Sequence, residues 1–183
     1  MDRMFSIEAG YFVIPVFLIY MILLFLTDKK KNKRYSIFQY TSLISFAVYI
    51  LSVITLTIFP IDVNTGIYAN QAPWYSSINF IPVLTIDIAT FALNIIMCIP
   101  LGVYLVIIYN ENTLSNIYKR SFLFSLCIEI TQLILRITVS NGRSMDINDL
   151  ISNTLGGVLG YVLIKSLIKN QSFSKIINRF KVY

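Results

Sequence analysis

The stretch NGRSMDINDLISNTLGGVLG, residues 141–160, is the part of the chain around which the other segments are best interpreted. It joins a polar cluster directly to an apolar segment. If a helix starts near Met145, the polar and small residues of this stretch recur at steps of three or four and share one face. These residues are Asp146, Asp149, Asn153, Gly156 or Gly157, and Gly160. The stretch therefore predicts an apolar helix that carries one polar stripe.

Two further polar stripes occur in apolar runs earlier in the chain. They consist of Glu129, Gln132 and Arg136 in one run, and of Asp87, Thr90 and Asn94 in the other, if that run is helical from Ile86. Polar side chains inside a membrane are stabilised by pairing with one another or by contact with water. We therefore expect the stripes to face one another.

The composition is that of an integral membrane protein. The 183 residues are 56% hydrophobic and 13% charged, the mean hydropathy is +0.71, and residues 35–118 contain no lysine or arginine. These values exclude an ordinary water-soluble domain. The chain has no histidine, which excludes a Ser-His-Asp triad and an HExxH zinc helix, so the acid and base of any enzyme here must be carboxylates. Cys98 and Cys127 lie in apolar runs without a CxxC pattern and are expected to be small core residues.

The hydropathy pattern predicts an all-α bundle of about five transmembrane helices in a single membrane domain, residues 1–183. A span needs roughly 20 apolar residues to cross a hydrocarbon core of about 30 Å. The predicted spans are residues 9–27, 36–59, 86–109, 121–139 and 147–168, with a polar loop at 110–120 and a basic cytoplasmic tail at 169–183. A cleaved signal peptide is disfavoured because a basic cluster, residues 29–34, follows the first apolar run instead of preceding it.

The distribution of charge predicts that the N-terminus lies outside the cell and the C-terminus inside. Of the 15 basic residues, 12 fall in the first loop, in the third loop, or in the tail and the adjoining end of the last span. Short loops rich in lysine and arginine stay in the cytoplasm, so the polar stripes are expected at the outer ends of their spans. The tail fits either an amphipathic helix on the anionic inner leaflet or a solvated segment.

The polar stripes supply the candidate site residues. Glu129, Asp146 and Asp149 are candidate catalytic carboxylates, and Asn94, Gln132, Arg143 and Asn153 are candidate binding residues. Arg136 or Arg143 can neutralise Glu129. The alternative is that these residues only join helices through buried polar contacts.

Asp146 and Asp149 are also candidate ligands of Mg²⁺, which prefers carboxylate oxygens. Their alternative role is to cap the first turn of the helix that follows. Gly156 and Gly160, four residues apart, predict close packing against another helix of the same chain.

Four motifs in order carry a resemblance to a known family. NFIP lies at residues 79–82, NIIMCIPLG at 94–102, SLCIEITQL at 125–133 and RSMDINDLISNTLGGVLGY at 143–161. Together they resemble the VanZ-like family, named for a teicoplanin-resistance protein, with a family core at residues 79–161. The family positions present are Asn94, Pro100, Gly102, Glu129, Gln132, Arg143, Asp146, Asp149, Asn153, Gly156, Gly157 and Gly160. The resemblance implies a small multi-pass protein of the bacterial plasma membrane, associated in some members with lower susceptibility to lipoglycopeptides.

Three classes of function stay open at this point. The first is a non-catalytic factor of the cell envelope whose outward-facing cavity binds a lipid-linked wall precursor or alters what a lipoglycopeptide meets. The second is an enzyme that acts on a lipid-linked phosphate, with or without Mg²⁺. The third is a small transporter, which the absence of an evident inverted repeat disfavours. Membrane lipids are expected partners in every case, and no nucleic acid is expected.

Overall fold

The computed structural model describes residues 2–30 and 34–183. Within these residues, five helices are long and apolar enough to cross a membrane. They are α1 (Gly10–Lys30), α2 (Ile37–Ile58), α3 (Ile88–Tyr109), α4 (Leu114–Val139) and α5 (Ile147–Ile168). The predicted all-α bundle of five spans is confirmed. Lys31 and Lys33 of the predicted basic loop lie outside the described residues.

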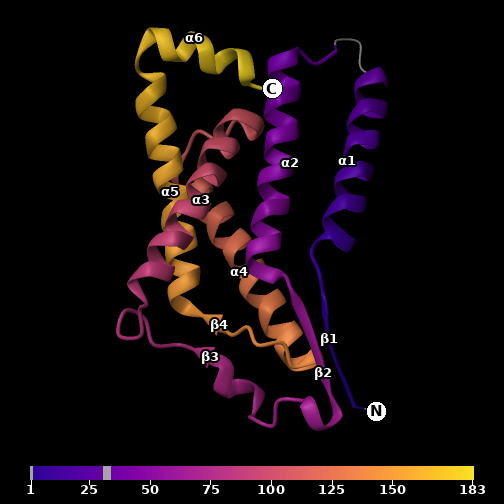
Figure 1. The fold of residues 1–183 in the computed structure, drawn as a ribbon. Coiled ribbons are helices and arrows are strands. Elements are labelled where there is room, and N and C mark those ends of the chain that lie inside the picture. The colour runs from indigo at the N-terminus through magenta and orange to yellow at the C-terminus, as the bar shows by residue number, and fades with distance from the viewer. Residues whose placement is uncertain (1, 31–33) are drawn as a thin grey trace.

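The two ends of the bundle differ in their charged residues. One end carries the N-terminus, the loop between α2 and α3, and the turn between α4 and α5 (Figure 1). The other end carries the connection between α3 and α4 and the C-terminus. Arg3, Arg136 and Arg143 belong to the first end, and the other described basic residues belong to the second.

α3 and α5 form the most extensive helix–helix contact in the described chain, and glycines allow their close approach. A Cβ on Gly160 would collide with the carbonyl oxygen of Ile99, and one on Gly156 would collide with that of Ile95. Gly102 of α3 approaches the backbone of Gly157 in the same way. The prediction that Gly156 and Gly160 pack within the chain agrees with this seam, because backbones can approach this closely only where side chains are absent.

The buried apolar core lies beside this seam, towards the basic end. It consists of Leu101, Leu105, Val106, Ile117 and Ile164. Cys98 is fully buried, as expected, but Cys127 is exposed. The expectation for Cys127 was wrong. In a membrane helix both the lipid-facing and the core-facing positions are apolar, so an apolar run does not show which of its residues are buried.

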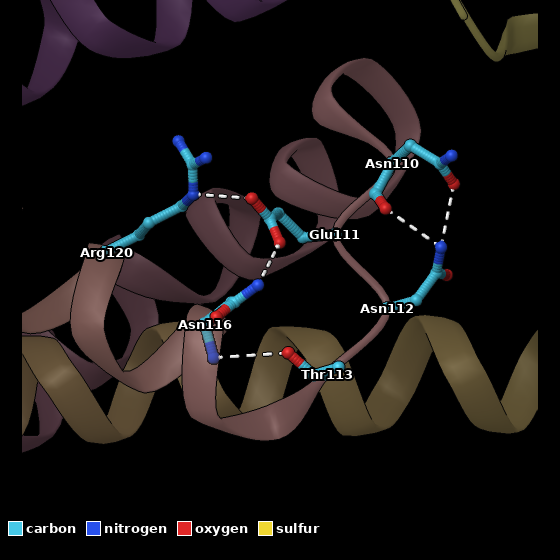
Figure 2. Close-up of polar contacts among 6 residues, drawn as sticks. All are labelled: Asn110, Glu111, Asn112, Thr113, Asn116 and Arg120. Carbon is cyan, nitrogen blue, oxygen red and sulfur yellow. Dashed lines mark hydrogen bonds and ion pairs between the residues drawn. The ribbon is translucent and has the colours of Figure 1, made fainter.

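The start of α4 differs from the sequence prediction. The helix begins at Leu114 and not near residue 121, since Thr113 caps it by accepting a hydrogen bond from the backbone N–H of Asn116 at 3.4 Å. Before the cap, Glu111 is buried and pairs with Arg120 Nε at 2.6 Å (Figure 2). Asn116 Nδ2 donates a second hydrogen bond to Glu111 at 3.0 Å. Residues 114–120 of the predicted loop thus form the first turns of α4, and residues 110–113 precede the helix.

Two small β-pairs, which the sequence analysis did not predict, close the opposite end. β1 (Arg3–Ile7) pairs antiparallel with β2 (Ile61–Thr65), and β3 (Ile78–Asn79) pairs parallel with β4 (Met145–Asp146). Short 3₁₀ turns at Gly66–Tyr68 and Trp74–Ser77 lie between β2 and β3. The second β-pair matters for the site, because it places the 60–83 loop beside the polar stretch at 141–160.

The tail forms α6 (Gln171–Phe180), which runs across the basic end of the bundle (Figure 1). Asn170 caps it by accepting a hydrogen bond from the N–H of Ser172 at 2.9 Å. The tail was predicted to be either an amphipathic helix or a solvated segment, and in the structure it contains a helix.

Candidate functional site

Asp146 is the junction between the loops and α5. As the N-cap of α5, its carboxylate accepts a hydrogen bond from the N–H of Asn148 at 2.7 Å. Asn79 Nδ2 donates to the same carboxylate at 3.0 Å. The backbone N–H of Asp146 donates to Glu129 Oε2 at 2.8 Å. One residue therefore connects the α2–α3 loop, α4 and α5, and its carboxylate performs the capping role that was the alternative to metal binding.

Glu129 is buried in α4 with 1% of its surface exposed. In the described chain, neither Arg136 nor Arg143 forms the expected ion pair with it. Arg136 Nη1 donates to the carbonyl of Asn141 at 3.1 Å, and Arg143 Nη2 donates to the carbonyl of Phe59 at 2.9 Å. The last carbonyl groups of α2 have no helical N–H partner, because no further turn follows them. They are therefore available as hydrogen-bond acceptors for Arg143.

Asp149 and Asn153 connect α5 to the neighbouring helices. Asn94 Nδ2 of α3 donates to Asp149 Oδ1 at 2.7 Å. Asn153 Nδ2 donates to Ser125 Oγ of α4 at 3.1 Å, and Asn153 Oδ1 lies 3.4 Å from Cys98 Sγ. The stripes of α3, α4 and α5 therefore meet, as the helical spacing predicted.

Gln132 joins α4 to α2 and keeps one acceptor free. Its Nε2 donates to the carbonyl of Thr57 at 2.8 Å. Its Oε1 is buried and accepts no hydrogen bond within the described residues. A buried acceptor without a partner is costly, so this oxygen is a natural point for a ligand hydroxyl or amide, or for a water molecule.

A pocket of about 550 Å³ lies between α2, α3, α4 and α5. Its polar lining consists of Thr90, Asn94, Glu129, Gln132, Arg143, Asp149 and Asn153, together with Tyr49, Ser52 and Thr57 of α2. All the candidate site residues except Asp146 are among them. The rest of the wall is apolar, and Leu56, Leu93 and Ile96 in it are exposed at the protein surface between α2 and α3. The pocket thus combines a polar lining with an apolar side wall.

Asp146 lines a smaller, neighbouring pocket of about 270 Å³, which it shares with Asp87 and Asp149. Asp87 caps α3, and hydrogen bonds from the hydroxyl and the N–H of Thr90 hold the pKa of its carboxyl below the usual value. Among the described residues, no group of three or more His, Cys, Asp or Glu side chains is arranged to hold a metal ion. Mg²⁺ stays a prediction, and no part of the proposed function depends on it.

Asn79 and Asn148 were not predicted as site residues. Asn148 is buried, accepts a hydrogen bond from the N–H of Val83 at 2.9 Å and donates to Thr85 Oγ1 at 3.1 Å. Together with the bond from Asn79 to Asp146, these contacts fix the loop before α3 over the start of α5. The asparagine of NFIP was visible as a motif residue, but only the fold reveals its partner.

A comparison with protein-family models identifies the family of the chain. The family model VanZ/LLP1 matches residues 46–169. The chain belongs to the VanZ/LLP1 family. The match begins within α2, ends just after α5, and so contains every residue of the larger pocket. In this VanZ/LLP1 protein, α1 and α6 lie outside the family match. No curated protein and no solved structure matches the chain.

Proposed function

We propose that this VanZ/LLP1 protein acts in the bacterial cell envelope. Its pocket faces the outer leaflet of the plasma membrane and binds the polar head of a lipid-linked wall precursor. By holding or shielding that precursor, it lowers susceptibility to lipoglycopeptides such as teicoplanin.

The observation that carries the proposal is the pocket's mixed lining. Glu129, Asp149 and the free Gln132 Oε1 supply acceptors for hydroxyl and amide groups, and Arg143 supplies a cation for a phosphate. The exposed apolar wall between α2 and α3 suits a hydrocarbon chain that enters sideways from the bilayer. A lipid with a polar head and an apolar tail has both properties.

The distribution of basic residues supports the outward orientation. The pocket is nearer the end of the bundle with few basic residues, whereas the described lysines lie at the opposite end. Under the positive-inside rule the lysine-rich end belongs in the cytoplasm. The pocket would then open at the depth of the outer leaflet, near the loop that carries Trp74.

The proposed function predicts that tolerance to two glycopeptides changes by different amounts. Teicoplanin has an acyl chain that holds it at the outer leaflet, and vancomycin has none. Expression in a susceptible Gram-positive host should therefore raise tolerance to teicoplanin more than to vancomycin. The test compares both drugs in strains with the wild-type protein, the Asp149→Asn variant and an empty vector. Equal susceptibility in all three, with the protein present in the membrane, would refute the resistance role.

A second candidate is an enzyme that acts on a lipid-linked phosphate. The observation in its favour is that Arg143 and the carboxylates of Glu129 and Asp149 line the same pocket. The arginine would bind the phosphate, and a carboxylate would act as general base. Purified protein should then release phosphate from a lipid-linked substrate, measured with added Mg²⁺ and with EDTA. Binding without turnover in both conditions would favour the non-catalytic role.

A further inference from the structure

The C-terminal helix α6 lies outside both the family match and the pocket, and it has a distinct amphipathic pattern. Phe173, Ile176, Ile177 and Phe180 recur at helical spacing and form one apolar stripe. Lys175 and Arg179, four residues apart, lie on the other side of the helix. This pattern is typical of helices that lie in the plane of a membrane interface.

The stripe is divided between the bundle and the exterior. Ile177 packs against the core, and the Phe180 ring lies 5.1 Å from the Phe38 ring of α2. Phe173 and Ile176 remain 49% and 54% exposed. The bundle therefore covers only part of the apolar face.

Hydrogen bonds fix the position of α6 against the bundle. Ser42 Oγ donates to the carbonyl of Phe180 at 2.8 Å, and Gln39 Nε2 donates to that of Lys181 at 2.8 Å. The N–H of Val182 donates to the carbonyl of Ile107 at 3.2 Å. The segment thus joins the start of α2 to the last turns of α3 and holds α6 across the end of the bundle (Figure 1).

The positive charge at this end of the bundle favours a negatively charged partner for the exposed part of the stripe. In α6 and the turn before it, three basic side chains are exposed: Lys169, Lys175 and Arg179. The same end of the bundle also carries the basic residues Lys29, Lys30, Lys119, Arg120 and Lys165. Each lysine or arginine near a membrane surface contributes about 1 kcal/mol of attraction to anionic lipid. Phe173 and Ile176 expose apolar surface beside those charges, and an anionic bilayer surface complements both properties.

We propose that α6 is an interfacial helix that binds anionic phospholipid. Phe173 and Ile176 insert among the acyl chains, and Lys175 and Arg179 contact the headgroups. The bound helix clamps α2 to α3 at the end of the bundle opposite the two β-pairs.

The test places a fluorescent reporter in the exposed stripe of the full-length protein. The chain has one tryptophan, so Trp74→Phe combined with Phe173→Trp gives a single indole in α6. The protein is reconstituted into phosphatidylcholine vesicles that contain an equal fraction of brominated phosphatidylglycerol or brominated phosphatidylcholine. The proposal predicts emission typical of an apolar site, weak quenching by aqueous acrylamide, and stronger quenching by the anionic brominated lipid.

Charge variants test the headgroup contact. Lys175→Gln should reduce the preference for the anionic lipid up to about five-fold, and so should Arg179→Gln. Arg3→Gln, which removes the same charge at the opposite end of the bundle, should leave it unchanged. Equal quenching by the two brominated lipids, an equal effect of Arg3→Gln, or an indole open to acrylamide would each overturn the proposal.

Discussion

At the scale of single residues, hydrogen bonds from neutral groups position the pocket carboxylates. Glu129 accepts from the backbone N–H of Asp146, and Asp149 accepts from the amide of Asn94. Neither contact requires the acceptor to be charged. Replacement of either side chain by its amide therefore keeps an accepting oxygen in place and removes the acid group.

Glu129→Gln and Asp149→Asn should each abolish the tolerance to teicoplanin while the protein still accumulates and remains monodisperse in detergent. A role in helix joining alone predicts the reverse, namely aggregation or degradation with no separate loss of function. The measurement combines drug susceptibility with size-exclusion chromatography of tagged protein. Glu111→Gln is the matched control, because it removes a buried carboxylate outside the pocket and should leave tolerance intact.

Arg120→Ala should lower the stability of the protein by about 1 kcal/mol, since it removes the partner of Glu111 and the arginine is half exposed. The expected result is a melting temperature a few degrees lower in detergent. Lys119→Ala is the control, because Lys119 is exposed and precedes Arg120 directly. If the two variants melt at the same temperature, the pair in Figure 2 contributes nothing to stability.

At the scale of elements, the sequence was most informative where polar residues recur in apolar helices. The predicted last span, residues 147–168, coincides with α5. The β3–β4 pair was missed because each of these strands has two residues, too few to show an alternating pattern. Helical spacing shows which residues share a face, but not the group that each one meets. The carbonyl partners of Arg143 and the position of Asp146 outside the larger pocket could therefore not be predicted.

Gly160→Ala should destabilise the protein by about 1–3 kcal/mol, because the added methyl group meets the carbonyl oxygen of Ile99 in a closely packed seam. Gly142→Ala should have little effect, since a Cβ there meets nothing within 4 Å among the described residues. Thermal unfolding of both variants in the same detergent tests the difference. A Gly160→Ala protein as stable as Gly142→Ala would mean that α3 and α5 are not held by this contact.

At the scale of the whole molecule, the orientation in the membrane is a prediction. Because basic residues gather at the α6 end, single cysteines in the 60–83 loop, such as Gln71→Cys, should react with a membrane-impermeant maleimide in intact cells. Ser174→Cys should not react until the cells are opened. Cys127→Ala in both proteins removes the exposed native thiol. Labelling with the opposite pattern would reverse the orientation and place the pocket at the inner leaflet.

The glycine seam also determines which wall of the pocket can move. Backbone packs on backbone between α3 and α5, so no side chain there can rotate to separate them. α2 contacts α3 through the hydrogen bond from the Tyr49 hydroxyl to the carbonyl of Met97 and through packing of its rings on Tyr104. It also bonds to Gln132 and Arg143 near one end, and to the C-terminal segment near the other. Such bonds can break and re-form one at a time, whereas the seam must separate as a unit. If the pocket opens to admit a ligand, we therefore expect α2 to move against an α3–α5 pair that stays together.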